Sequence, residues 1–178
     1  SIQDHDLTKR TLGIARTRNL NGAWRVDSLP IVPLSEQVEN SSLYFEDKIT
    51  TWFLFTNHIG INQSGTEYTY AIWVYWSTDL NSWNTKNKAI VLDGSNCNWA
   101  KGAIGMPSVI RSGDRLALFY DAPGGSSISH MKRNIGLAWI DRPLKIPKAI
   151  LPEGVSGKQD SLSVRHNLLR KVDSLDGI

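Results

Sequence analysis

The chain has 178 residues, a formal charge of +3 and seven tryptophans, which is enough polypeptide for one domain with a full core. Its basic residues occur as scattered pairs without interleaved aromatic side chains, so nucleic-acid binding is not expected. The single cysteine, Cys97, excludes an internal disulfide, and no apolar run approaches the ~20 residues of a membrane-spanning helix.

Short apolar segments separated by turn residues predict strands along most of the chain. Two of them, residues 11–16 and 25–32, flank a turn. Four more lie within residues 36–93 and predict one antiparallel sheet, with a charged turn at residues 46–48. These four segments are residues 39–45, 51–55, 71–76 and 89–92.

The pattern then starts again. A loop at residues 94–105 is rich in Asn and Gly and carries Cys97 and Trp99. Beyond it, a module at residues 102–151 holds three predicted strands, at residues 106–110, 116–120 and 134–139. In residues 152–178, loop residues precede leucines at helical spacing, which predicts a short helix or a docked tail.

Two sequence matches indicate an internal repeat. Residues 9–15 match residues 132–138, and residues 17–24 match residues 77–83. Leu20, Leu80 and Leu144 lie roughly 60 residues apart. Four strands per repeat with turns between them predict blades of a β-propeller. A β-sandwich is the alternative, but it does not predict the same turn in each repeat.

The predicted fold is therefore all-β and part of a β-propeller, with about two and a half four-stranded blades. The half blade spans residues 1–35, and the two blades span residues 36–93 and 102–151. We expect the missing propeller blades to come from the rest of the chain or from another chain.

Two motifs resemble a known family. Ser77-Thr78-Asp79-Leu80-Asn81-Ser82-Trp83 follows the third strand of one blade, and Ile135-Gly136-Leu137-Ala138-Trp139 forms the third strand of the next. Both are similar to the five-bladed propeller glycoside hydrolases, nearest to glycoside hydrolase family 43, and the likeness covers residues 9–145. It implies inverting hydrolysis of arabinosides or xylosides in plant-type oligo- or polysaccharides. It also implies no cofactor beyond a structural calcium at the propeller axis, and we expect a secreted or periplasmic protein.

The resemblance assigns one catalytic residue. In that family the general acid is a Glu at the start of the third blade's first strand, usually followed by Gly-Pro. Glu39-Asn40-Ser41 occupies this place without the Gly and the Pro. Hydrolysis needs a second carboxylate, but the family's other two lie in earlier blades and are not assigned here. Without the resemblance, Glu39 reads as a solvated surface charge.

Five further residues are candidates to bind substrate. Asp121 and His58 close equivalent second strands, although turn residues that cap backbone amides are the alternative. His130 and Arg133 are candidates to hydrogen-bond sugar hydroxyls, although an exposed loop histidine is usually inert. Trp99 is a candidate to stack on a sugar ring, whereas the strand tryptophans are expected in the core. Four scattered histidines predict no metal site.

Two other functions fit the same pattern. A carbohydrate-binding propeller without turnover would explain the altered Glu-Asn-Ser sequence. A protein-binding propeller scaffold predicts an exposed apolar ring on one face and no acidic cleft.

Overall fold

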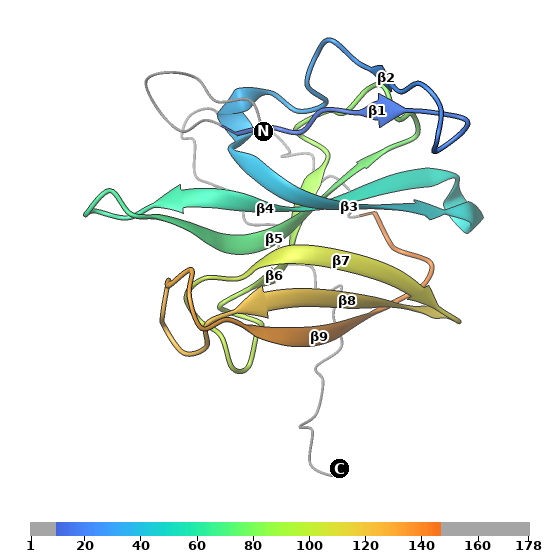
Figure 1. Cartoon of the computed structure of the whole chain (residues 1–178). Helices are drawn as coiled ribbons and strands as arrows, with labels where there is room; N and C mark the ends of the chain where they lie inside the picture. Colours follow the sequence, from blue (N-terminus) through green and yellow to red (C-terminus); the bar gives the residue numbers. More distant parts are fainter. Residues whose placement is uncertain (1–9, 147–178) are drawn as a thin grey trace, which may run out of the picture.

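The computed structural model describes residues 10–146, and the tail predicted at residues 152–178 lies outside them. Within the described residues the protein is all-β, as predicted, with antiparallel sheets and two short 3-10 turns, η1 (Leu34–Glu36) and η2 (Asp47–Ile49) (Figure 1). Among these residues, no helix has the length and apolar character to cross a membrane.

Two sheets make up the body of the protein. The four-stranded sheet is a meander of β3 (Val38–Glu46), β4 (Thr51–Ile61), β5 (Glu67–Ser77) and β6 (Lys88–Asp93). The three-stranded sheet contains β7 (Gly105–Ser112), β8 (Arg115–Ala122) and β9 (Asn134–Asp141). All seven strands predicted from residue 39 onward are present. Most extend past the apolar run that predicted them, because polar residues at their ends also pair.

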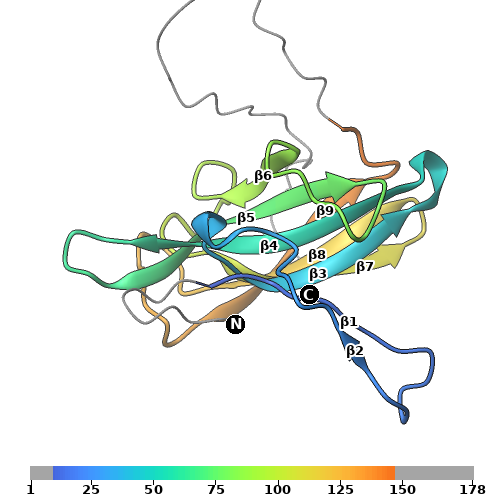
Figure 2. The same ribbon diagram turned by 90° about the horizontal axis from the view of Figure 1, so that it is seen from above.

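The N-terminal hairpin is shorter than the sequence predicts. It consists of β1 (Ala15–Arg16) and β2 (Arg25–Val26) and projects away from the sheets (Figure 2). Beyond these residues the two segments are joined by single hydrogen bonds, such as the 2.8 Å bond from Ile31 N to Leu12 O. Pro30 has no N–H group to donate, so a regular ladder does not continue through the predicted strand at residues 25–32.

The repeated turn predicted from the sequence has the same hydrogen bonds in both copies. Thr17 Oγ1 donates to Asn19 O at 2.7 Å, and Ser77 Oγ donates to Asp79 O at 2.7 Å. In each copy the Asx side chain then accepts a bond from the second following amide, at 3.1 Å and 2.9 Å. The two turns are therefore structurally equivalent.

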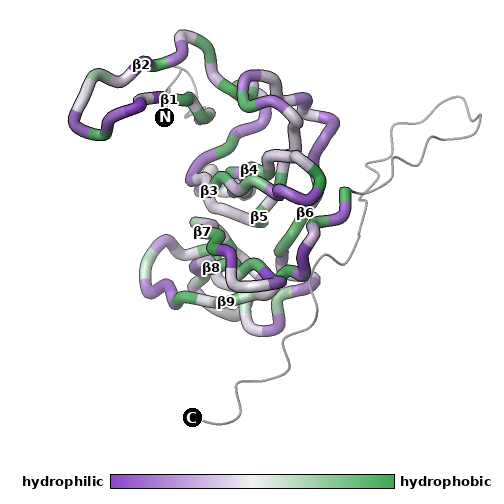
Figure 3. Tube along the Cα trace, turned by 90° about the vertical axis from the view of Figure 1, so that its right-hand side faces the viewer, coloured by the Kyte–Doolittle hydropathy of each residue, from purple (hydrophilic) through white to green (hydrophobic). Residues whose placement is uncertain are grey.

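The hydrophobic core lies mainly between the two sheets, which pack face to face with β7 against β3 and β4 (Figures 1 and 3). Phe53 and Phe55 of β4 point into it, and Leu116 and Leu118 of β8 meet them. The alternate residues of β4 point the other way, and there Leu54 packs with Tyr75 and Val32. Both faces of β4 are thus buried, which explains its almost continuous apolar sequence.

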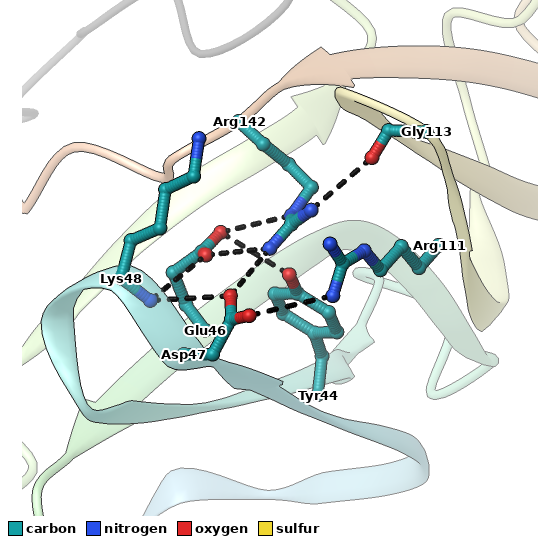
Figure 4. A network of polar contacts seen from close by, with 7 residues as sticks. All are labelled: Tyr44, Glu46, Asp47, Lys48, Arg111, Gly113 and Arg142. Atoms are coloured by element: carbon teal, nitrogen blue, oxygen red, sulfur yellow. Dashed lines mark hydrogen bonds and ion pairs between the residues drawn. The ribbon is translucent and has the colours of Figure 1, made fainter.

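A buried ion pair joins the two sheets at one end (Figure 4). The carboxylate of Glu46, at the end of β3, is 0% exposed, and the side chain of Arg142, just after β9, is 2% exposed. Arg142 Nη2 lies 2.7 Å from Glu46 Oε1, and Arg142 Nε lies 3.1 Å from Oε2. The Tyr44 hydroxyl also donates to Glu46 Oε2 at 3.1 Å. This two-point contact fixes the orientation of the two groups as well as their distance.

Arg142 also contacts the two neighbouring turns. Its Nη1 donates to Gly113 O at 3.1 Å in the turn between β7 and β8, and its Nη2 reaches Asp47 Oδ1 at 2.7 Å. The charged turn predicted at residues 46–48 therefore differs from a solvated loop, because Glu46 points inward while Asp47 stays exposed.

Arg142→Met should lower the melting temperature by about 10 °C, because it leaves the Glu46 carboxylate buried without a cation. Arg111→Met is the control, since Arg111 pairs with Asp47 at 3.5 Å with both side chains more than half exposed, and it should change the melting temperature by only a few degrees. Circular dichroism measures both. Equal shifts in the two variants would contradict the structural role of the buried pair.

Candidate functional site

One end of the two sheets gathers eight polar residues, four of which were predicted. We call this group the polar end. It lies where β3, β5, β7 and β9 begin and where β4 and β8 end, so a meander brings it together from distant parts of the sequence. Its members are Arg10, Glu39, Asn57, Glu67, Thr69, Asp121, His130 and Arg133.

Glu39 sits on an irregular stretch at the start of β3. The pairing register with β4 shifts between Glu39 and Ser41, and Asn40 between them has φ 49°. Asparagine adopts this left-handed conformation more readily than most residues other than glycine. Asn40 therefore suits the left-handed backbone at this position.

The Glu39 carboxylate, 24% exposed, has two neighbours. Its Oε2 accepts a bond of 2.9 Å from Arg10 Nη1. Its Oε1 lies 3.5 Å from the amide nitrogen of Asn57, the residue opposite it on β4. The carboxylate is thus held in place while one side of it remains open to solvent.

Arg10 places a second carboxylate beside Glu39. Its Nη2 lies 2.7 Å from Glu67 Oε2 at the start of β5, so one guanidinium lies between two carboxylates. The internal repeat is a signal for Arg10, because it aligns Lys9-Arg10 with Lys132-Arg133. No sequence pattern points to Glu67, which lies beside the β4–β5 turn and resembles an ordinary turn charge.

The equivalent place in the three-stranded sheet has the same backbone shape but no acid. The register shifts between Gly105 and Ser108, and Met106 has φ 52°. A Cβ atom on Gly105 would lie 2.7 Å from Thr69 Oγ1, so a side chain is excluded there. Met106 N donates to Asn57 Oδ1 at 3.1 Å, which connects the two sheets beside Glu39.

Asp121 and Arg133, both predicted, bind each other. Arg133 Nε and Nη2 lie 2.6 Å and 2.7 Å from the two carboxylate oxygens, and both side chains are mostly buried. Arg133 also donates to Ser129 O at 3.1 Å. The pair fixes the loop between β8 and β9, and its charges are engaged with each other.

His130 belongs to the same loop and reaches the other sheet. Its Nε2 lies 2.6 Å from the backbone oxygen of Glu67, and its ring is otherwise exposed. The loop therefore reaches the start of β5, at the residue whose side chain pairs with Arg10.

His58 lies elsewhere, on the face of the four-stranded sheet that points away from β7. Its Nε2 is 2.8 Å from the hydroxyl of Tyr75, and its ring stacks on Trp73 with centroids 4.6 Å apart. The ring is buried, whereas the neighbouring Asn57 points toward the three-stranded sheet. Asn57, and not His58, is therefore the residue of β4 that lies at the polar end.

An ion pair between Glu36 and Lys88 lies next to Tyr75, the partner of His58. Tyr75 donates to Glu36 Oε2, to which Lys88 Nζ also binds. Burial, followed by the charge of Lys88, lowers the pKa of His58 to about 4, although Glu36 opposes the shift. Burial and the bond to Glu36 raise the pKa of Tyr75, so its hydroxyl stays a donor.

Trp99 packs in the core at the edge of the sheets. Its indole stacks on Tyr120 with centroids 5.8 Å apart, and its Nε1 donates to the Tyr120 hydroxyl at 2.8 Å. Its hydrogen-bond donor and one ring face are thus used inside the protein.

Among residues 10–146, no three His, Cys, Asp or Glu side chains are grouped to hold a metal ion. A scan against protein-family models found none that matches the chain, and a search of curated proteins found no match.

Acid should weaken the fold through His58. The buried ring stays neutral down to about pH 4, whereas in the unfolded chain it takes up a proton near its ordinary value of 6.5. Its contribution to stability is therefore complete above pH 6.5 and declines as the pH falls toward 4, by about 2 kcal/mol at pH 4.5. Urea unfolding at pH 7 and pH 4.5 measures this loss.

His58→Gln is the matched variant, because glutamine cannot titrate. Its free energy of unfolding should fall about 2 kcal/mol less between the two pH values than that of the wild type. An identical fall in both proteins would show that His58 is not the group responsible.

Proposed function

We propose that this chain is part of a β-propeller glycoside hydrolase, in which Glu39 protonates the leaving oxygen of a glycosidic bond. The substrate would be a plant-type oligo- or polysaccharide with arabinoside or xyloside linkages, as the family resemblance implies. Such a substrate agrees with the expected secreted or periplasmic location.

The observation that carries the proposal is the irregular backbone at Glu39. A left-handed backbone conformation occurs at equivalent places in both sheets, at Asn40 and at Met106. Only Asn40 follows an acidic residue, Glu39. A carboxylate that is fixed by neighbours and open on one side suits a proton donor, because general acid catalysis requires a positioned group within reach of the substrate. Arg10 and Glu67 would position Glu39, and the resemblance assigns the second reacting carboxylate to another blade.

The propeller architecture is supported by how the two sheets repeat each other. Ser42 faces Phe55 in one sheet, and Ser108 faces Phe119 in the other. Ser42 Oγ accepts the backbone N–H of Val109 from the next sheet at 3.0 Å. Ser108 is the equivalent residue and is exposed, so it would accept the same bond from a further sheet.

The outer face of the three-stranded sheet carries several exposed apolar side chains beside polar ones. Leu116 and Leu118 point into the core, so the alternate residues of β8 and their partners point outward. Four of these outward residues are apolar and between 36% and 82% exposed: Ile110, Phe119, Ile135 and Leu137. Their equivalents on the four-stranded sheet, such as Phe55, are covered by β7. A further blade would cover this face in the same way.

The N-terminal hairpin supports the same arrangement. Leu20, Trp24, Val26 and Leu29 are each at least half exposed, and a two-stranded hairpin alone is marginally stable. Two additional strands beside it would complete the half blade expected from the sequence.

A sugar-binding propeller without turnover is the second candidate. The ion pair between Arg10 and Glu39 favours it, because an engaged carboxylate is not ready to donate a proton. Hydrolysis would then require the substrate to displace Arg10.

Glu39→Gln should reduce hydrolysis of an unactivated pentoside by about 10²–10⁴-fold, because the leaving oxygen is no longer protonated. A 2,4-dinitrophenyl pentoside needs little protonation, so its hydrolysis should fall much less. Both rates are measured in the natural polypeptide that contains this chain. Asp114→Asn, in the turn at the far end of the sheets, is the control. An equal loss for both substrates would remove Glu39 as the acid, and no turnover by the wild type would favour the sugar-binding candidate.

Ile110→Asp tests whether a further blade covers the outer face of the three-stranded sheet. In this structure Ile110 and Ile61 are equally exposed, at 56%. If a further blade covers Ile110, its substitution in the natural polypeptide should cost about 2 kcal/mol or more, since it buries a charge. Ile61→Asp, at the tip of β4, should cost less than about 0.5 kcal/mol. Equal costs in urea unfolding would argue against a blade at this position.

A further inference from the structure

A polar cavity lies at the other end of the four-stranded sheet, away from Glu39. It has a volume of about 420 Å³ and opens to solvent. The start of β4, the end of β5, the segment leading to β6 and Ile146 form its walls. Small-molecule sites in proteins have volumes of about 300–1,000 Å³, so the cavity is large enough to take a ligand.

The lining combines one aromatic ring with neutral polar groups. The members are Thr51, Trp76, Ser77, Thr78, Asp79, Ser82, Asn84, Asn87 and Ile146. Of the lining residues within 10–146, Asp79 alone carries a charge, and none is Lys or Arg. A phosphate, a carboxylate or a sulfated ligand would find no cation there, so an anionic ligand is not expected.

Some of these polar groups already serve the fold, and others are free. Asp79 Oδ1 and Asn84 Oδ1 accept backbone N–H groups of their own turns at 2.9 Å each. Within residues 10–146, the side chains of Thr78 and Asn87 have no hydrogen-bond partner. A hydroxyl and an amide are thus available beside the half-buried ring of Trp76.

We propose that this cavity binds a neutral sugar residue of a glycan. A sugar ring presents C–H groups that pack on an aromatic face, and hydroxyls that pair with amide, hydroxyl and carboxylate groups. Trp76 supplies the face, while Thr78 and Asn87 supply the hydrogen bonds. Because the part of β4 from Thr51 to Asn57 separates the cavity from Glu39, the bound sugar takes no part in bond cleavage. The site holds a polymer on the protein, and it does so whether or not Glu39 is catalytic.

The test is retardation of the full chain in native gels that contain soluble arabinoxylan, with titration of xylohexaose, arabinohexaose, cellohexaose and mannohexaose. The wild type should bind arabinoxylan or at least one hexaose. The double variant Thr78→Ala/Asn87→Ala should bind at least about fivefold more weakly, because two hydrogen bonds are lost. Gln63→Ala, in the exposed β4–β5 turn, should bind like the wild type.

Glu39→Gln separates this site from the proposed active site. It should keep full binding even where hydrolysis is lost. The proposal is overturned if no probe binds, if the double variant binds like the wild type, or if Glu39→Gln abolishes binding. Circular dichroism checks that the variants fold, and Asn87→Asp, which keeps the side-chain shape but removes the amide donors, replaces the double variant if that one does not.

Discussion

The contact between the two sheets is the constraint on which the rest of this protein depends. β7 crosses β3 and β4 over a core of Phe53, Phe55, Leu116 and Leu118. Polar bonds hold the two ends of that contact. At one end Arg142 binds the buried Glu46, and at the other Met106 N binds Asn57. Since apolar packing has little directional preference, these end contacts fix how one sheet is oriented on the other.

The polar end exists only because the sheets have this orientation. Glu39 and Glu67 belong to one sheet, whereas His130 and Arg133 come from the other and meet Glu67 and Thr69 across the boundary. Arginines make most of these links, and each guanidinium satisfies several acceptors at once. The geometry of a site that lies between two sheets depends on how the sheets pack. A change in the core would therefore move the residues around Glu39.

The sequence predicted the strands well and the site in part. Strand positions follow from alternating apolar runs, and the repeated turn follows from a hydroxyl residue two positions before an Asx residue. The partners of Glu39 were missed because ion pairs between distant segments leave no local pattern, as Glu67 shows. Glu46 looked like a turn residue because its burial depends on Arg142, 96 residues later. His58 was predicted to bind substrate, but it points away from the other sheet. The strand alternation that turns Phe53 and Phe55 toward that sheet also turns Asn57 toward it.

The repeated turn has a consequence for how such chains are related to one another. Between its two copies Thr replaces Ser and Asn replaces Asp, yet the donors and acceptors stay the same. The arginine before the first copy, Arg16, also donates to Asn81 in the second at 2.8 Å. Ancestral duplication of a single unit would produce this arrangement, with selection then acting on bonding capacity and letting residue identity drift. Because different residues make the same bonds in the two copies, a search for this turn should match a hydroxyl residue two positions before an Asx residue and not one fixed sequence.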